Sequence, residues 1–169
     1  ASGPGTSGCS LCQAGTYQNI YGQTMCTACT NGHYCVEGSS APLPCPAGKR
    51  SNRSLAVMTS QDDCLSCESG EACSVGSITA TRCAPGTYNA QDTQATCSSC
   101  EPSTYQNETG ASGCKRCLAG SYCPAGASAA LPCQAGSYSS STSLASAEEC
   151  TVCPEGSSCG IGVTTHARC

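Results

Sequence analysis

Cysteine is the residue of this chain with the most capacity for chemistry, at 20 of 169 residues. Six pairs have Cys-x2-Cys spacing, which suits zinc binding, thiol redox chemistry or disulfide formation. The pairs are 9/12, 26/29, 64/67, 97/100, 114/117 and 150/153. Zinc sites need converging thiolate pairs or histidines, and the only two histidines, His33 and His166, do not recur between repeats. No βαβ pattern surrounds any pair, as a thioredoxin-type site requires. We therefore expect disulfides, with no metal and no cofactor.

Other catalytic patterns are missing from the sequence. Most of the carboxylates lie at loop positions that do not recur between repeats, and there is no nucleophile elbow, phosphate loop or calcium loop. We expect no catalytic residues and no enzyme activity. The net charge of −4, with seven scattered Lys and Arg, also argues against a nucleic-acid partner.

Apolar residues are too scarce to build an ordinary core. The chain has no Phe and no Trp, and Gly, Ser, Thr and Ala dominate. Covalent staples must therefore supply the order that burial normally supplies, by restricting the unfolded chain. Dense disulfides persist in oxidising surroundings, so we expect an extracellular or cell-surface protein. No apolar stretch is long enough to insert into a membrane, and the start at Ala1 indicates a removed signal peptide or a piece of a longer chain.

The cysteines repeat as two blocks of ten. The offset between matching cysteines is 88 residues for six pairs and 86 for four. We assign residues 1–8 to the end of a preceding module, 9–96 to the first block and 97–169 to the second, incomplete block. Inside the blocks, C-x2-C-x5-C-x9-C occurs four times without variation, beginning at Cys26, Cys64, Cys114 and Cys150. Such repetition predicts an elongated tandem array of short β-hairpin and loop modules, small and disulfide-rich, with almost no helix.

The motifs resemble a known family. The run Cys117-Leu-Ala-Gly-Ser-Tyr-Cys123-Pro-Ala-Gly, then Leu131-Pro-Cys133-Gln-Ala-Gly-Ser-Tyr138, is similar to the ephrin-receptor-like cysteine-rich repeat. In style it is also similar to the modules of tumour necrosis factor receptors. The resemblance implies an extracellular ladder of disulfides, as in receptor ectodomains and large surface proteins of algae and other protists. It transfers no catalytic residue.

Spacing alone leaves the disulfide connectivity open, but the repeat suggests one set of pairs. Cysteines that flank a Gly-x-Tyr-type loop would pair across a hairpin, and the remaining ones would pair across a five-residue gap with glycine at its third position. The expected pairs are Cys12–Cys26, Cys29–Cys35, Cys45–Cys64, Cys67–Cys73, Cys83–Cys97, Cys100–Cys114, Cys117–Cys123, Cys133–Cys150 and Cys153–Cys159. Cys9 and Cys169 are left for partners outside this chain. We favour a window from a longer array over a bond between Cys169 of one copy and Cys9 of the next.

Two loops carry N-glycosylation sequons, Asn52-Arg53-Ser54 and Asn107-Glu108-Thr109. Both loops should be exposed, so both asparagines are candidate attachment points, although a bare sequon is the alternative. The Ser/Thr run 137–146 is a candidate for O-linked sugar or a plain flexible loop.

Six tyrosines recur in register, at 17, 34, 88, 105, 122 and 138, and we expect them to cover disulfides. Tyr21 lies outside the pattern and is a candidate for an outward contact. The segment 50–58 departs most from the repeat, with Arg50 in a tyrosine position and Leu55, Val57 and Met58 as a possible binding hot spot.

The favoured hypothesis is an extracellular structural protein: a stalk, coat or filament component whose partners are neighbouring repeats or other copies of itself. The alternative is a receptor or adhesion ectodomain that binds a ligand, for which segment 50–58 would be the contact.

Overall fold

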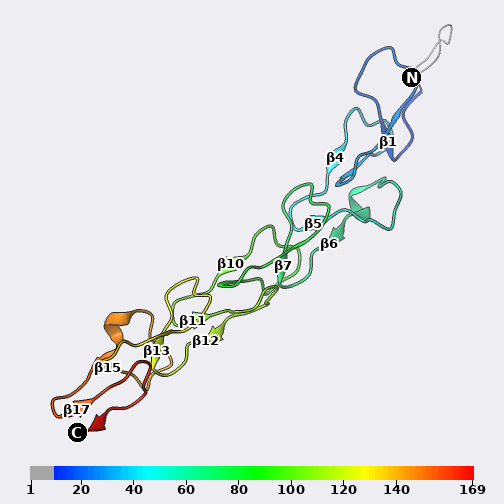
Figure 1. Cartoon of the computed structure of the whole chain (residues 1–169). Helices are drawn as coiled ribbons and strands as arrows, with labels where there is room; N and C mark the ends of the chain where they lie inside the picture. The colour runs from blue at the N-terminus through cyan, green and yellow to red at the C-terminus, as the bar shows by residue number, and fades with distance from the viewer. Residues whose placement is uncertain (1–9) are drawn as a thin grey trace. The chain divides into compact units, whose positions relative to one another are not determined.

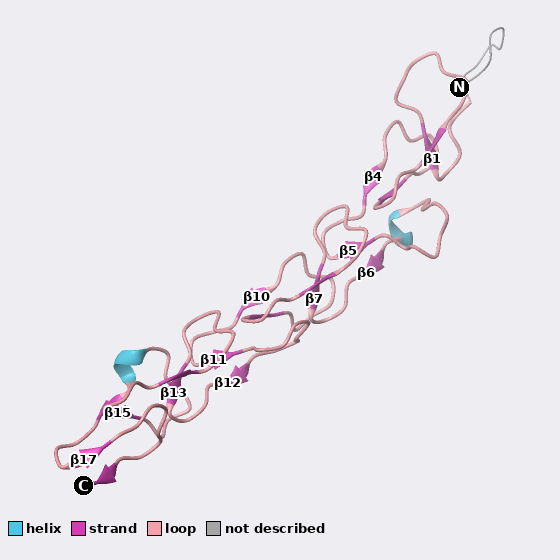
Figure 2. Cartoon of the chain, in the orientation of Figure 1, coloured by secondary structure: helices cyan, strands magenta, loops and turns pink. Residues whose placement is uncertain are grey.

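The structure, a computed structural model, describes residues 10–169. Within that range it contains eighteen two-residue strands and two 3-10 helices, joined by loops (Figure 2). The strands are β1 Thr16–Tyr17, β2 Thr27–Ala28, β3 His33–Tyr34, β4 Leu43–Pro44, β5 Lys49–Arg50, β6 Leu65–Ser66, β7 Glu71–Ala72, β8 Thr81–Arg82, β9 Thr87–Tyr88, β10 Ser98–Ser99, β11 Thr104–Tyr105, β12 Lys115–Arg116, β13 Ser121–Tyr122, β14 Leu131–Pro132, β15 Ser137–Tyr138, β16 Thr151–Val152, β17 Ser157–Ser158 and β18 Ala167–Arg168. The helices are η1 Gln61–Asp63 and η2 Ala147–Glu149. The expected class, disulfide-rich tandem hairpin modules nearly free of helix, is confirmed.

Each odd-numbered strand pairs with the next strand along the chain, giving nine separate two-stranded sheets among the described residues. The pairing is antiparallel where its register is resolved, as in Thr104 opposite Arg116 and Tyr105 opposite Lys115. Sheets this small bury little surface, and an isolated two-stranded hairpin is marginal in water. Their order must therefore come from cross-links and from contacts between hairpins.

A left-handed turn residue precedes every odd-numbered strand. In eight hairpins this residue is glycine, and the five-residue gaps place Gly32, Gly70, Gly120 and Gly156 there with φ between +70° and +80°. The predicted need for a permissive backbone in these gaps is confirmed. The ninth hairpin uses Ser103 at φ +68°, and its hydroxyl donates to the carbonyl of Ser143 at 2.6 Å.

The core consists of sulfur. The nine largest side chains with less than 2% exposure are all cysteines. Among the described residues, the larger apolar side chains that reach burial are Met58 and Leu144, at 3% and 8% exposure. Many other large apolar side chains remain exposed, so the disulfides fill the place that leucines and phenylalanines take in an ordinary domain.

The chain divides into two compact units. Of the described residues, the first unit takes those up to 68 with 72–81 and 92–96, and the second takes 69–71, 82–91 and 97–169. Within the second unit, the labelled strands from β10 to β17 follow one another in chain order (Figure 1).

Backbone hydrogen bonds join each hairpin to the next, and the pattern repeats. In the second unit, the N–H of Gly86 donates to the carbonyl of Gln106 at 2.7 Å, and that of Asn89 donates to Ala111 at 3.1 Å. A third bond runs back, from Gly110 N–H to the carbonyl of Cys83 at 2.8 Å.

The first unit repeats this pattern of three bonds. Gly48 N–H donates to Cys73, Ser51 N–H donates to Ser77, and Gly76 N–H returns to Cys45, at 2.7 to 2.8 Å. Because only main-chain groups take part, these three hydrogen bonds can form with different side chains in the two hairpins.

The turn glycines also approach the hairpin after next. A Cβ built on Gly86 would lie 2.3 Å from the carbonyl oxygen of Gly126, and one on Gly32 would lie 2.5 Å from that of Gly76. Real Cβ atoms do not approach oxygen this closely, so only glycine fits. In both units, hairpins thus contact the next neighbour by hydrogen bonds and, at turns such as Gly32 and Gly86, the one beyond by close packing.

Candidate functional site

The disulfide framework is the largest chemical feature of the chain. The structure joins the nine pairs that the repeat suggested: 12–26, 29–35, 45–64, 67–73, 83–97, 100–114, 117–123, 133–150 and 153–159. Their Cα–Cα distances lie between 5.6 and 6.3 Å, within the usual range for disulfides. Every pair is local, with sequence separations from 6 to 19 residues. Such a framework persists only under oxidising conditions.

Of the two cysteines assigned to partners outside the chain, Cys169 lies within the described residues. Cys169 is exposed and carries a free thiol, and its N–H donates to the carbonyl of Gly156 at 3.0 Å. Cys9 and the segment 1–8 lie outside the described residues.

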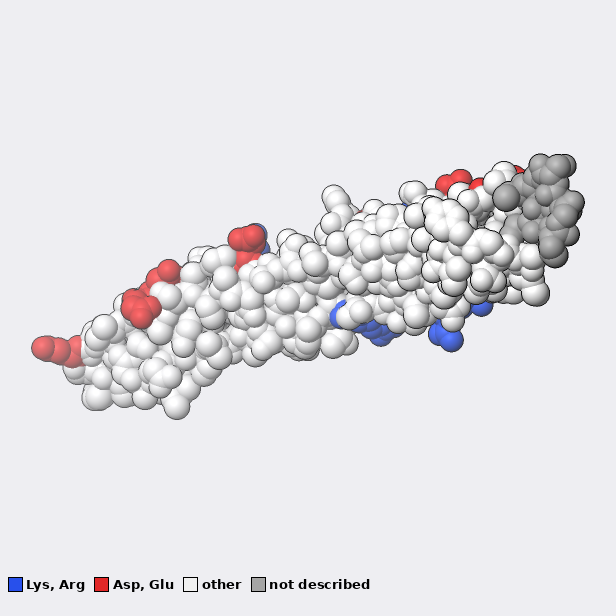
Figure 3. Space-filling view, turned by 90° about the horizontal axis from the view of Figure 1, so that it is seen from above, with Lys and Arg blue, Asp and Glu red and all other residues white. Residues whose placement is uncertain are grey.

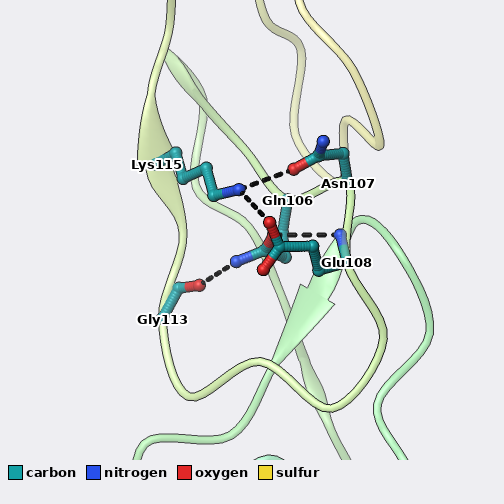
Figure 4. A network of polar contacts seen from close by, with 5 residues as sticks. All are labelled: Gln106, Asn107, Glu108, Gly113 and Lys115. Atoms are coloured by element: carbon teal, nitrogen blue, oxygen red, sulfur yellow. Dashed lines mark hydrogen bonds and ion pairs between the residues drawn. The ribbon is translucent and has the colours of Figure 1, made fainter.

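The sequon at Asn107 lies on the exposed loop between β11 and β12, inside a polar network (Figure 4). Lys115 reaches from β12 and donates to Asn107 Oδ1 at 2.8 Å and to Glu108 Oε1 at 2.7 Å. Gln106, which is buried, ties the loop together. Its Nε2 donates to the carbonyl of Gly113 at 2.6 Å, and its Oε1 accepts the N–H of Glu108 at 3.0 Å. The amide oxygen of Asn107 is therefore held by Lys115 on an exposed surface.

The sequon at Asn52 is partly buried, on the loop between β5 and β6. Its Oδ1 accepts the N–H of Ser54 at 3.1 Å, and its own N–H points to the sulfur of Met58 at 3.4 Å. The loop lines one side of a partly open cavity of about 300 Å³. The two sequons therefore occupy different surroundings, one open and polar, the other beside a cavity.

The interpretation of 50–58 as a free hot spot is wrong in part. Met58 is 3% exposed and packs against Cys45, Cys64 and Tyr34, so it is unavailable to a partner. Its carbonyl also accepts the N–H of Cys35 at 3.1 Å. The longer loop places Met58 in contact with the 45–64 disulfide, while Leu55 and Val57 stay exposed.

The tyrosine prediction is confirmed at two positions and refined there. Tyr34 packs against the 45–64 disulfide, and Tyr105 packs against Cys117 and Cys123. In both cases the ring covers the disulfide that follows in the chain, because consecutive hairpins are stacked. Tyr138 instead makes an edge contact with His166 at 5.3 Å. Tyr21 is fully exposed.

Sequence reasoning missed two anchors of the loops. The first is the amide of Gln106, whose signal was the shared Thr-Tyr-Gln-Asn at 16–19 and 104–107.

The second is an acidic cap at each 3-10 helix. The carboxylate of Asp63 accepts the N–H groups of Thr59 and Ser60 at 2.6 and 3.1 Å, and these bonds lower the pKa of Asp63. Its signal was Ser60-x-x-Asp63, a capping box.

The described surface offers little other chemistry. No group of three metal-ligating side chains occurs between residues 10 and 169. In the view of Figure 3 most of the surface carries neither acidic nor basic side chains, and the acidic groups are scattered. No helix in the described part has the length and apolar character needed to span a membrane.

A scan against protein-family models finds no family that matches the chain, and a search of curated proteins finds no match at a significant level.

Proposed function

We propose that the chain is part of an extracellular structural element, a stalk, coat or filament made of tandem disulfide-stapled hairpins. The observation that carries this proposal is that the same set of main-chain hydrogen bonds recurs between successive hairpins, as in the triplets around Gly86 and Gly48, and that close packing recurs with the hairpin beyond. Contacts limited to near neighbours allow repeats to be added without changing the existing ones, which is the property a linear structural array needs. Localisation at the cell surface or beyond it is part of the same proposal, on account of the nine disulfides.

Electron microscopy of the purified, oxidised protein tests the proposal directly. Rods or fibres are the expected result, and reduction with a thiol should abolish them. A preparation that contains only compact globular particles would refute the structural role.

We propose further that the array is a glycoprotein, with N-linked sugar on Asn52 and Asn107 and O-linked sugar within 137–146. Asn107 is exposed, and Lys115 holds only its amide oxygen. The supporting argument for both sites is the compartment, since N-linked transfer takes place in the secretory pathway. Intact-mass and peptide mass spectrometry of secreted protein would detect the sugars.

The resemblance to ephrin-receptor-like repeats is likewise a proposal. Its support is the invariant C-x2-C-x5-C-x9-C spacing, repeated four times. Non-reducing peptide mapping tests the connectivity on which it depends, and a pairing other than the nine neighbouring bridges would count against it.

A receptor or adhesion role is the second candidate, and one surface observation favours it. Ile20 and Tyr21 are 59% and 102% exposed and lie with Gln18, Asn19 and Ser40 around a hollow of about 290 Å³. If this surface binds a ligand, Tyr21→Ala should abolish capture of a partner while leaving the disulfide map unchanged. Unchanged capture would remove this candidate.

A further inference from the structure

We infer that the cavity beside Asn52 is the seat of the first sugar of a glycan attached to that asparagine. The cavity has a volume of about 300 Å³ and is lined by Asn31, Ser51, Asn52, Arg53, Leu55 and Ile78. The inference rests on the proposed glycosylation of Asn52 and adds to it a binding site for the sugar.

The volume suits one sugar ring. Sites for small molecules begin at roughly 300 Å³, so this cavity is at the lower end of the range and would not hold a longer saccharide. It is also partly open, which leaves an exit for the rest of a branched glycan. A single ring, with the chain continuing into solvent, fits both properties.

The lining is amphipathic in the way that a sugar ring is. Leu55 and Ile78 are 42% and 45% exposed, and they offer an apolar wall to the C–H face of a ring. Asn31 and Arg53 offer hydrogen-bond donors to hydroxyl and acetamido oxygens. The one ion pair of the described residues joins Lys115 to Glu108, so the guanidinium of Arg53 is not held by a carboxylate.

Contacts of Ser51 and Asn52 fix the position of the asparagine that would carry the sugar. Ser51 is buried, with its hydroxyl directed at the sulfur of Met58, and the N–H of Asn52 points to the same sulfur at 3.4 Å. The side-chain oxygen of Asn52 is engaged by Ser54 N–H, whereas the sugar is carried by the other amide atom, Nδ2. Because the attachment residue is itself part of the cavity wall, the first ring is held at high effective concentration beside Leu55 and Ile78.

Asn107 serves as the internal comparison. It is exposed, and its amide oxygen accepts from Lys115 in the polar network of Figure 4, whereas Asn52 is half-buried in the wall of a cavity. A sugar on Asn107 should therefore extend into solvent.

Native deglycosylation of the secreted, full chain tests the inference. A peptide-N-glycosidase is added without denaturant, and release at each site is followed by mass spectrometry of the peptides. We expect release at Asn52 to be about tenfold or more slower than at Asn107. After reduction and denaturation the two rates should become similar.

Two variants keep their sequons and form a matched pair. Arg53→Ala removes a lining group of the cavity and should speed native release at Asn52, whereas Glu108→Ala changes the corresponding middle residue of the other sequon and should leave release at Asn52 unchanged. Ile78→Ser, outside both sequons, should also speed release at Asn52. Each variant is accepted only with an unchanged disulfide map.

The possible outcomes distinguish glycosylation of Asn52 from the seating of its first sugar in the cavity. If both asparagines carry sugar and native release is equally fast, the seat is refuted and glycosylation stands. If Asn52 of the secreted protein carries no sugar, both glycosylation at that site and the seat are refuted.

Discussion

Replacing Gly86 by alanine should loosen the stack of hairpins around it, and Gly136→Ala is the matched control. Both glycines lie in the second unit with nearly the same φ, +84° and +87°. An alanine in the left-handed region costs about 1 kcal/mol or slightly more at either position. Nothing lies within 4 Å of a Cβ on Gly136, whereas one on Gly86 would lie 2.3 Å from the Gly126 carbonyl oxygen.

The extra cost at Gly86 follows from these distances. Ordinary van der Waals contact begins at 3.4 Å, so the backbone at Gly126 must move by about 1.1 Å, the difference between 3.4 and 2.3 Å. Such a shift is enough to break the bonds from Gly126 N–H to Cys100 and from Gln106 N–H to Ala127. At about 1 kcal/mol each, their loss adds roughly 2 kcal/mol to the conformational cost.

Native-state hydrogen exchange of the oxidised protein measures the effect. With Gly86→Ala, exchange at the Gly126 and Gln106 amides should accelerate about 30-fold, which corresponds to 2 kcal/mol. With Gly136→Ala, these amides should exchange at the wild-type rate. Equal acceleration in the two variants would show that backbone conformation, and not the close approach between hairpins, requires the glycine.

Three further predictions concern the core, the caps and the cross-links. Met58→Ala should destabilise the first unit by about 2 kcal/mol, at the lower limit for a buried methionine, while the exposed Leu55→Ala should change stability by less than about 0.5 kcal/mol. Thermal unfolding of the oxidised protein compares the two variants. Hydrogen bonds lower the pKa of Asp63, so the cap that its carboxylate forms should be intact at neutral pH and lost as the pH falls through that depressed pKa. An NMR titration of the Thr59 amide should show this step, and Asp63→Asn should abolish it. Full reduction and alkylation should remove the amide dispersion of the NMR spectrum, because each closed loop of about 15 residues contributes roughly 3 kcal/mol; a reduced chain that stays folded would contradict the sulfur core.

The cysteine register made the hairpins predictable. Because C-x2-C-x5-C-x9-C recurs without variation, each cysteine has a defined place, and the left-handed turns at Gly32 and Gly120 follow from the five-residue gaps. The candidate sequons were also readable directly, since a sequon is a local pattern. What these features share is that they depend on neighbours in the chain.

Contacts between hairpins were not predictable in the same way. That Tyr34 covers the following disulfide, or that Met58 is buried, depends on stacking geometry, which no local spacing encodes. The cavity at Asn52 depends on Ile78, which comes from the next hairpin along the chain. Such features require the three-dimensional arrangement of successive modules.

The sequential disulfides have a mechanical consequence. Among residues 10–169 no bridge encloses another, so tension applied to the two ends of this segment passes through the cystines and bypasses the loops they close. These loops include the 18 residues between Cys45 and Cys64, which cannot extend under load until the disulfide breaks. A chain cross-linked in this way has little hidden length, and under load we expect it to extend less than a chain without the cross-links.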